Sequence, residues 1–252
     1  MRERLKVNGI DVTASEGDTI LRAARRGGFD IPSLCHHEAV RAIGACRICL
    51  VEVVNGDQKV LTTACNTPVE GEMEVITDSE EIRRHRATNL ELLLGRAPRS
   101  KAIRALARKY GVSEPRFAPP AASDLEGCIL CELCVRVCET LGHSALAAVE
   151  RGGKKHIGSP FGKPSEQCVG CGACYTVCPA ECIAMVDSRT TRKIWDREFR
   201  LVSCQSCGEP VMTEAHREFA VKNGELKEDY YTTCVACKKK NMAQRFAGVG
   251  VR

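Results

Sequence analysis

The sequence predicts an α+β protein, in which a small mixed α/β module is followed by a helical connector and two cysteine-rich segments. Three observations support this prediction. Short apolar runs surround one helical stretch in residues 1–78, and apolar residues recur at helical spacing in residues 79–117. Cysteine clusters then occupy residues 118–190 and 191–252, so these four ranges are the expected domains.

The first module contains the signals of a small sheet with one helix. Strands are expected at residues 4–7 and 10–13, joined by an Asn-Gly turn. A helix is expected over residues 19–26, with Ser15 as its N-cap. A second Asn-Gly pair lies between β-branched runs and predicts a hairpin within residues 50–63.

The connector is cysteine-free and helical in its spacing. Pro98 divides it into two expected helices, and a proline-bearing linker is expected over residues 112–127. A run of basic side chains suits a solvated helix face, with a partner-docking patch as the alternative. This run contains Arg96, Arg99, Lys101, Arg104, Arg108 and Lys109.

The seventeen cysteines set the chain apart from an ordinary globular protein. They fall in CxxC-type clusters, a pattern that favours metal ligation over a disulfide framework. No stretch approaches the roughly 18 uncharged apolar residues of a membrane span, and the charged start has no apolar signal core. We therefore expect a reducing, cytoplasmic location.

The first cysteine group has the spacing C-x10-C-x2-C-x15-C. Its close pair and remote fourth cysteine agree with a plant-type [2Fe–2S] loop, whereas its first gap is longer. Gly44 and Ala45 are small, which lets backbone N–H groups approach the cluster. A structural zinc site is the alternative reading of the spacing. The expected ligands are Cys35, Cys46, Cys49 and Cys65.

Two C-x2-C-x2-C-x3-C runs follow, in the pattern of ferredoxins with two [4Fe–4S] clusters. In such proteins the fourth cysteine of each run ligates the other cluster. Cluster one is therefore assigned to Cys128, Cys131, Cys134 and Cys178, and cluster two to Cys168, Cys171, Cys174 and Cys138. Cys182 is left over, and a buried free thiol is favoured over a ligand role.

The last two CxxC pairs suit one tetrahedral ion held by four thiolates. Zinc is the preferred ion, with a single iron or a further cluster as alternatives. The expected role is to staple a zinc-ribbon-like tail. Lys238, Lys239 and Lys240 suit a subunit interface better than nucleic acid. The expected ligands are Cys204, Cys207, Cys234 and Cys237.

The first group lies in the run PSLCHHEAVRAIGACRICLVEV, followed by LTTACNTPVEGEMEVITDSEEIRRHRATNLELLLG. This stretch strongly resembles the N-terminal segment shared by the large iron–sulfur subunit of complex I, [FeFe]-hydrogenases and the diaphorase subunit of NAD-linked hydrogenases. The segments CILCELCVRVCE and IGSPFGKP resemble the same family. The resemblance implies a β-grasp ferredoxin-like [2Fe–2S] domain. It also implies one further [4Fe–4S] cluster on a His and three cysteines, which residues 95–111 cannot supply because they contain no cysteine.

The chain has no G-x-G-x-x-G, P-loop or zincin motif, so hydride chemistry is expected in another subunit. The resemblance implies an electron-transfer subunit, itself non-catalytic, that pairs with a flavin- and NAD(P)H-binding subunit. The expected setting is a soluble transhydrogenase, hydrogenase or formate dehydrogenase complex, with electron bifurcation as one mode and ferredoxin or a catalytic subunit as acceptor. The alternatives are a free-standing ferredoxin-like carrier and a zinc-ribbon regulatory or nucleic-acid-binding module.

The charge of the chain argues against nucleic acid. The formal net charge of +5 counts every cysteine as neutral. Two [4Fe–4S], one [2Fe–2S] and one zinc site, each with its thiolates, would together contribute about −8. Aromatic residues form only 4% of the chain, which leaves little surface for base stacking.

Overall fold

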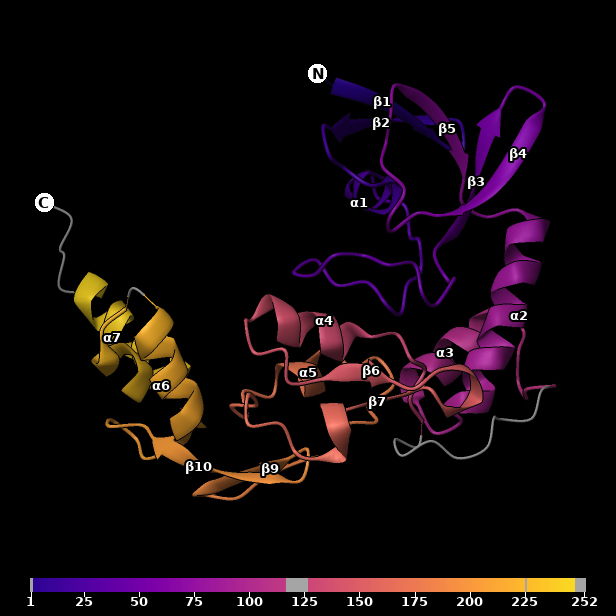
Figure 1. The fold of residues 1–252 in the computed structure, drawn as a ribbon. Coiled ribbons are helices and arrows are strands. Elements are labelled where there is room, and N and C mark those ends of the chain that lie inside the picture. The colour runs from indigo at the N-terminus through magenta and orange to yellow at the C-terminus, as the bar shows by residue number, and fades with distance from the viewer. Residues whose placement is uncertain (1, 117–126, 225, 248–252) are drawn as a thin grey trace, which may run out of the picture.

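The computed structural model describes residues 2–116, 127–224 and 226–247. A sheet module at the N-terminal end is followed by two connector helices, which lead to the cysteine-rich segments and the C-terminal helices (Figure 1). Most of the expected linker, residues 117–126, lies outside the described residues. Within the described part of the chain, no helix is long and apolar enough to cross a membrane.

The N-terminal module is a five-stranded mixed sheet in the order β2-β1-β5-β3-β4. Strands β1 and β5 pair in parallel, and the other neighbours pair antiparallel. Helix α1 (Ile20–Arg26) buries four apolar side chains against the sheet core. The expected strands and hairpin are confirmed as β1 (Arg2–Val7), β2 (Ile10–Ser15), β3 (Leu50–Asn55) and β4 (Gln58–Thr63), and β5 is Glu72–Ile76.

The expected helix cap at Ser15 is wrong. Ser15 is still part of β2, and its backbone N–H donates to the Asp18 carboxylate at 2.7 Å. The helix begins later, and the Thr19 hydroxyl accepts a hydrogen bond from the Arg22 backbone N–H at 3.3 Å. Cross-strand pairing holds Ser15 in the sheet, so the next hydroxyl in the chain caps the helix.

The connector consists of α2 (Glu80–Arg96) and α3 (Lys101–Lys109), divided near Pro98 as expected. Ser79 and Ser100 cap the two helices. Their buried apolar faces join one core with the first cysteine loop and with α4 (Leu133–Thr140). The connector thereby fixes the sheet module against the cysteine-rich segments. Its core residues are Leu90, Leu94, Ala97, Ile103 and Ala107.

The segment with the paired cysteine runs is built from two short helices and a small hairpin. Helices α4 and α5 (Ala173–Thr176) each start inside a cysteine run. Strands β6 (Ala147–Val149) and β7 (His156–Gly158) pair antiparallel between the two runs. Two short 3-10 turns complete this segment, η1 (Gly152–Lys154) and η2 (Pro160–Gly162).

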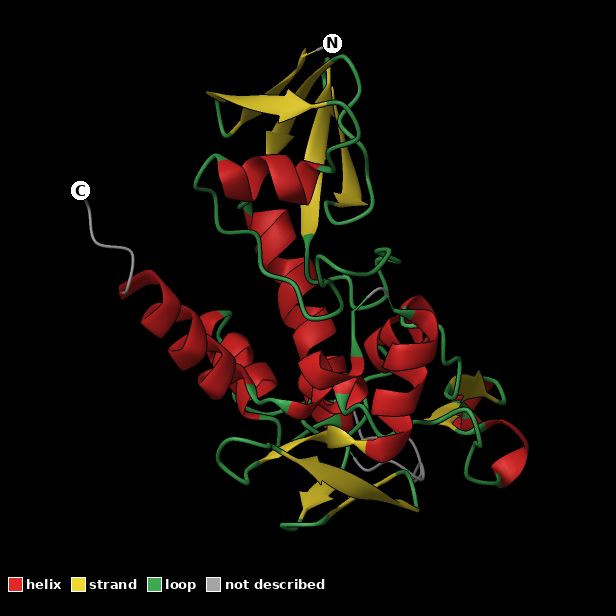
Figure 2. Ribbon diagram, turned by 90° about the vertical axis from the view of Figure 1, so that its left-hand side faces the viewer, coloured by secondary structure: helices red, strands yellow, loops and turns green. Residues whose placement is uncertain are grey.

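The C-terminal segment contains a four-stranded sheet in the order β11-β10-β9-β8. This sheet and the N-terminal sheet lie at opposite ends of the molecule, with helices between them (Figure 2). Because β8 precedes residue 190 and pairs with β9, the sheet crosses the expected boundary between the last two domains. The four strands of the sheet are β8 (Met185–Asp187), β9 (Thr191–Ile194), β10 (Arg197–Ser203) and β11 (Pro210–Thr213). They are followed by α6 (Glu214–Asn223), η3 (Glu228–Thr232) and α7 (Val235–Ala247).

Candidate metal centres

The structure brings the first four cysteines together beneath the N-terminal sheet. Three of them lie on the loop between α1 and β3, and Cys65 follows β4. All four are buried, and the Cys46 backbone N–H donates to the Cys35 sulfur at 3.4 Å. Hydrogen bonds from the Cys46 and Cys65 thiols hold the pKa of Cys35 far below its usual range. The cluster of buried thiols fits a group that binds thiolates, such as [2Fe–2S].

Gly44 shapes this loop for two reasons. Its φ is 63°, in the left-handed region, and a Cβ placed there would lie 2.9 Å from the Thr63 hydroxyl. The residues that follow turn their amides inward, since the backbone N–H groups of Ala45 and Cys46 both lower the pKa of Cys35. This agrees with the expectation that small residues let the backbone approach the metal site.

The two paired runs surround two separate cavities, and the fourth cysteine of each run lies in the cavity of the other. The first cavity has an empty volume of about 320 Å³ and the second of about 340 Å³. Cys178, from the second run, lines the first cavity, and Cys138, from the first run, lines the second cavity. The first is lined by Cys128, Cys131, Cys134, Cys178 and Cys182, and the second by Cys138, Cys168, Cys171 and Cys174.

Both runs fold into the same backbone shape. Leu130 and Glu132 in the first run, and Gly170 and Gly172 in the second, have positive φ angles. Left-handed residues in alternation turn successive N–H groups toward one point, which makes a concave site for negative charge. The Leu130 N–H accordingly donates to the Cys128 sulfur at 3.4 Å. Gly170 also admits a close neighbour, because a Cβ there would lie 2.6 Å from the Phe199 ring.

Further donors to the sulfurs come from positions that the sequence reasoning did not identify. Trp195 follows β9, and its indole N–H donates to the Cys174 sulfur at 3.3 Å. The Ala145 backbone N–H donates to the Cys138 sulfur at 3.3 Å. Hydrogen bonds to cluster sulfurs stabilise the reduced state and raise the reduction potential. The one sequence signal for such a donor is that Trp195 is the only tryptophan of the chain.

Arg136, between the third and fourth cysteines of the first run, connects the first cysteine group with the first cavity. Its guanidinium donates to the carbonyl oxygens of Cys35 at 2.9 Å, Cys131 at 3.0 Å and Arg41 at 2.6 Å. The side chain is buried, and its Nε has no hydrogen-bond partner. Two of the three accepting carbonyls therefore belong to expected ligands of different clusters, joined by one buried positive charge.

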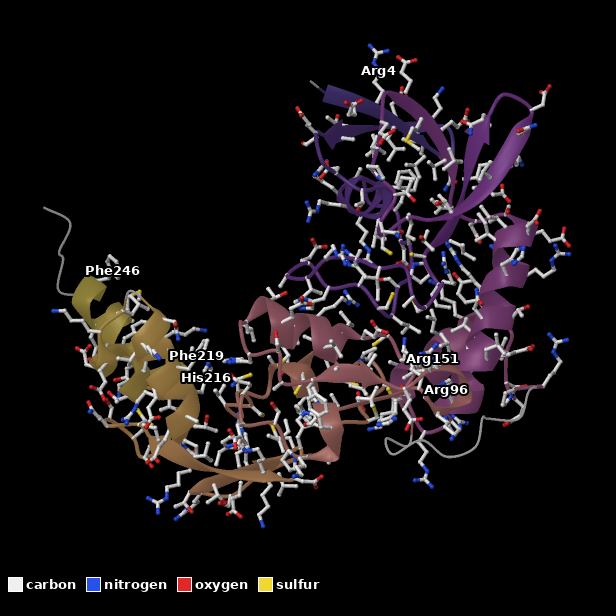
Figure 3. The ribbon with its side chains drawn as sticks, viewed as in Figure 1. Arg4, Arg96, Arg151, His216, Phe219 and Phe246 are labelled. Carbon is white, nitrogen blue, oxygen red and sulfur yellow. The ribbon has the colours of Figure 1, made fainter. Side chains whose placement is uncertain are left out.

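The basic residues of the connector do not form one uniform solvated face. Arg96 donates through Nε to the Cys128 carbonyl at 3.0 Å and so supports the first cavity. Figure 3 shows Arg96 beside the cysteine-rich segment. Arg104 donates to the Pro98 carbonyl, and Lys109 pairs with Asp30 at 2.9 Å across the exposed surface. At least these three basic side chains have structural partners within the chain.

The four C-terminal cysteines form one compact group. Their sulfur atoms all lie within 4.8 Å of one another, and those of Cys207 and Cys234 are 3.7 Å apart. A tetrahedral ion with Zn–S bonds of about 2.3 Å places its sulfurs about 3.8 Å apart. The Cys234 backbone N–H donates to Cys204 at 3.3 Å and lowers the pKa of Cys204 to about 6, which favours the thiolate. The group fits a single metal ion.

The two halves of this group come from unlike elements. Cys204 and Cys207 lie in the turn between β10 and β11, whereas Cys234 and Cys237 lie at the start of α7. The second pair thus opens a helix instead of a second hairpin. Helix α6 of the tail packs beside the second cavity, where the His143 and Phe219 rings lie 4.3 Å apart and His143 faces His216 edge-on. Figure 3 labels Phe219 and His216 on α6.

Known families match the two regions that hold the cysteine groups. Residues 4–80 match the 2Fe-2S iron-sulfur cluster binding domain, and residues 121–185 match the 4Fe-4S dicluster domain. With the geometry above, these matches define the class of the molecule. It is an iron–sulfur protein in which a [2Fe–2S] domain precedes a [4Fe–4S] dicluster domain.

Within that class, the chain is homologous to subunits of NADPH and NADH oxidoreductases and hydrogenases. It is 33% identical over 234 residues to the NADPH-Fe(3+) oxidoreductase subunit alpha of Geobacter sulfurreducens, covering 84% of this chain and 27% of that protein. It is 31% identical over 204 residues to the NADP-reducing hydrogenase subunit HndD of Solidesulfovibrio fructosivorans, covering 69% and 34%. The chain therefore spans about a quarter to a third of these relatives.

A solved structure gives the same result. The NAD+-reducing [NiFe]-hydrogenase in the H2-reduced state matches with a TM-score of 0.57 and 27% identity, covering 65% of this chain and 77% of the matched chain. A further relative, the NADH-ubiquinone oxidoreductase 75 kDa subunit of Reclinomonas americana, is 28% identical over 212 residues, which is 75% of this chain and 30% of that protein. The resemblance to complex I and hydrogenase subunits inferred from the cysteine motifs is confirmed.

Proposed function

We propose that this protein relays single electrons between a flavin- and NAD(P)H-binding partner subunit and a second redox partner, either ferredoxin or a catalytic subunit. The observation that carries this proposal is the direct contact between the first cysteine group and the first cavity. Arg136 joins the loops of Cys35 and Cys131, and the same apolar core contains both residues. Stepwise electron passage requires closely spaced centres in a rigid, dry matrix, and this core supplies that matrix.

We further propose the ligand sets. The N-terminal module, as a β-grasp domain, holds [2Fe–2S] on its four buried thiols, and the crossed cavities hold the two [4Fe–4S] clusters. The C-terminal group holds zinc in a zinc-ribbon-like site. When bound, the clusters accept and release one electron at a time, whereas a flavin in the partner converts the two-electron hydride into single electrons. The chain itself positions the sulfurs, shields them from water and donates hydrogen bonds to them.

Metal analysis tests the ligand sets. Protein purified without oxygen is expected to contain about ten irons and one zinc per chain, from one two-iron and two four-iron sites. Elemental analysis combined with acid-labile sulfide determination gives both counts. A content of about four irons would contradict the two paired cavities, and one extra iron in place of zinc would reassign the C-terminal group.

Reduction of the native complex tests the relay. The tagged chain, purified without oxygen from its own host, is expected to bring with it a flavin-containing subunit. NAD(P)H should then bleach the visible absorbance of the clusters in the complex. The isolated chain should be bleached by dithionite and remain oxidised with NAD(P)H, because it has no nucleotide motif of its own.

Two results would contradict the relay in different ways. A stable monomer in the host extract, without a flavin subunit, would indicate a free-standing electron carrier. Salt-sensitive binding to oligonucleotides by a chain without redox-active iron would indicate a nucleic-acid-binding module. If the complex reduces two acceptors of unequal potential from one NAD(P)H pool, electron bifurcation is its mode of operation.

A further inference from the structure

The first cavity contains one more thiol than an iron–sulfur cubane needs. Cys182 lies between α5 and β8, and its sulfur is 3.6 Å from that of Cys178. Its side chain also hydrogen-bonds with Cys128, and all three cysteines line the same cavity. Cys182 therefore lies among the expected ligands, in contact with two of them. It is not a packing residue at a distance from the site.

The second cavity has no equivalent thiol. When the two runs are aligned by their cysteines, Cys138 corresponds to Cys178 and Gly142 corresponds to Cys182. Among the described residues that line the second cavity, four are cysteines, against five in the first. The chain thus supplies its own matched control, one cavity with a fifth thiol and one without.

The backbone directs Cys182 into the cavity. Glu181, just before it, has a φ of 54°, in the left-handed region, and its N–H donates to the Cys178 carbonyl at 3.3 Å. This tight turn brings two side chains four residues apart to the same point.

We propose that Cys182 is a reserve ligand of the first [4Fe–4S] cluster and exchanges with Cys178 at the same iron. This proposal rests on the ligand sets proposed above. In the exchange, the Fe–S bond to Cys178 breaks and that thiolate takes up a proton, while Cys182 loses its proton and forms the new Fe–S bond. Charge and electron count are unchanged, so no oxidant or reductant is required. The two sulfurs are close enough for this to need only a local movement.

The consequence is that the first cluster survives the loss of its fourth ligand, whereas the second does not. An iron that loses its cysteine is released readily, and a four-iron cluster then becomes a three-iron cluster. In the first cavity the neighbouring thiol recaptures the iron. Cys182 would act in this way when Cys178, which is half-buried, is oxidised or otherwise modified, since thiolates within reach of solvent are the sites of such damage.

The experiment compares Cys178→Ala with Cys138→Ala in the full chain, purified without oxygen. Cys178→Ala is expected to retain about ten irons and to show no three-iron EPR signal. Cys138→Ala should lose one to four irons and show either a three-iron signal or one cluster fewer. The double variant Cys178→Ala with Cys182→Ala should behave like Cys138→Ala. The [2Fe–2S] EPR signal in each sample reports whether the chain has folded.

The proposal is overturned if Cys178→Ala loses iron as Cys138→Ala does while keeping its [2Fe–2S] signal. It is also overturned if Cys182→Ala alone lacks the first cluster, because Cys182 would then be a primary ligand. A second measurement needs no change to a primary ligand. In air, Cys182→Ala should develop the three-iron signal faster than the unmodified chain, and equal rates would contradict a reserve role. If the unmodified chain contains no four-iron clusters, the proposed function fails instead.

Discussion

Replacing Arg136 with methionine is expected to make both the [2Fe–2S] site and the first [4Fe–4S] site harder to reduce. Arg136 is 8% exposed, and its guanidinium donates to the backbone of both ligand loops. A buried positive charge stabilises the added electron at each site. At roughly 10 Å and an effective dielectric constant of about 20, one unit charge contributes about 1.7 kcal/mol, which corresponds to about 70 mV.

The substitution should also weaken the contact between the sheet module and the dicluster segment. Three carbonyl oxygens would lose their donor inside the core, at a cost of about 3 kcal/mol. EPR-monitored redox titration measures the potentials, and denaturant unfolding under anaerobic conditions measures the stability. These two readouts separate an electrostatic role from a purely structural one.

Two control variants make the result decisive. Arg136→Lys keeps the charge and loses the forked geometry. It should therefore lower the stability while leaving both reduction potentials close to those of the unmodified chain. Arg86→Met removes another buried guanidinium, which donates to the Leu50 carbonyl and the Tyr110 hydroxyl, and should leave the first [4Fe–4S] potential unchanged. Unchanged potentials in Arg136→Met would refute the electrostatic role of this residue.

Cys237→Ser is expected to abolish metal binding at the C-terminal site and to unfold the surrounding tail. The group joins the β10–β11 turn to the start of α7, and helix α6 beside it contributes no fully buried residue of its own. Binding of zinc by small four-ligand sites is worth about 10 to 16 kcal/mol at neutral pH, so the metal supplies most of the ordering of such a tail.

Metal analysis and limited proteolysis test this expectation. The variant should lose one zinc and keep its irons. Proteases should cut within η3 and α7 faster than they cut the rest of the chain. Cys182→Ser serves as the matched control, because it removes a thiol outside the group and should retain zinc. A variant that loses zinc and remains protected would show that the tail is held by its contacts with the dicluster segment alone.

Much of this architecture was predictable because ligand spacing and local periodicity can be read from residues that are close together in the sequence. The cysteine runs, the hairpin on its Asn-Gly turn and the two connector helices around Pro98 depend on residues close in sequence. The Ser15 cap failed because a cross-strand pairing outweighed a local helix signal. At such positions tertiary contacts override the local helix propensity.

Long-range contacts were not predictable from the sequence. Nothing in the run around Arg136 indicates that its side chain crosses to a loop about a hundred positions earlier. The hydrogen bond from Trp195 to Cys174 likewise depends on where the four-stranded sheet lies. The pairing of β8 with β9 across residue 190, where the sequence predicts a domain boundary, is likewise a contact that local patterns do not indicate.

The packing of the tail on the second cavity limits how the chain can be shortened. Ile194 and Trp195 line that cavity, Phe199 packs in the same core, and the Phe219 ring on α6 lies tilted against His143 at its edge. A fragment ending where the ferredoxin-like motif ends would leave the second cavity uncovered on this side and would expose the cluster expected there to water and dioxygen. Fragments for spectroscopy should therefore extend through α7, so that they keep both α6 and the four-cysteine group beside it, even though Cys174, the last expected ligand of that cluster, lies far upstream.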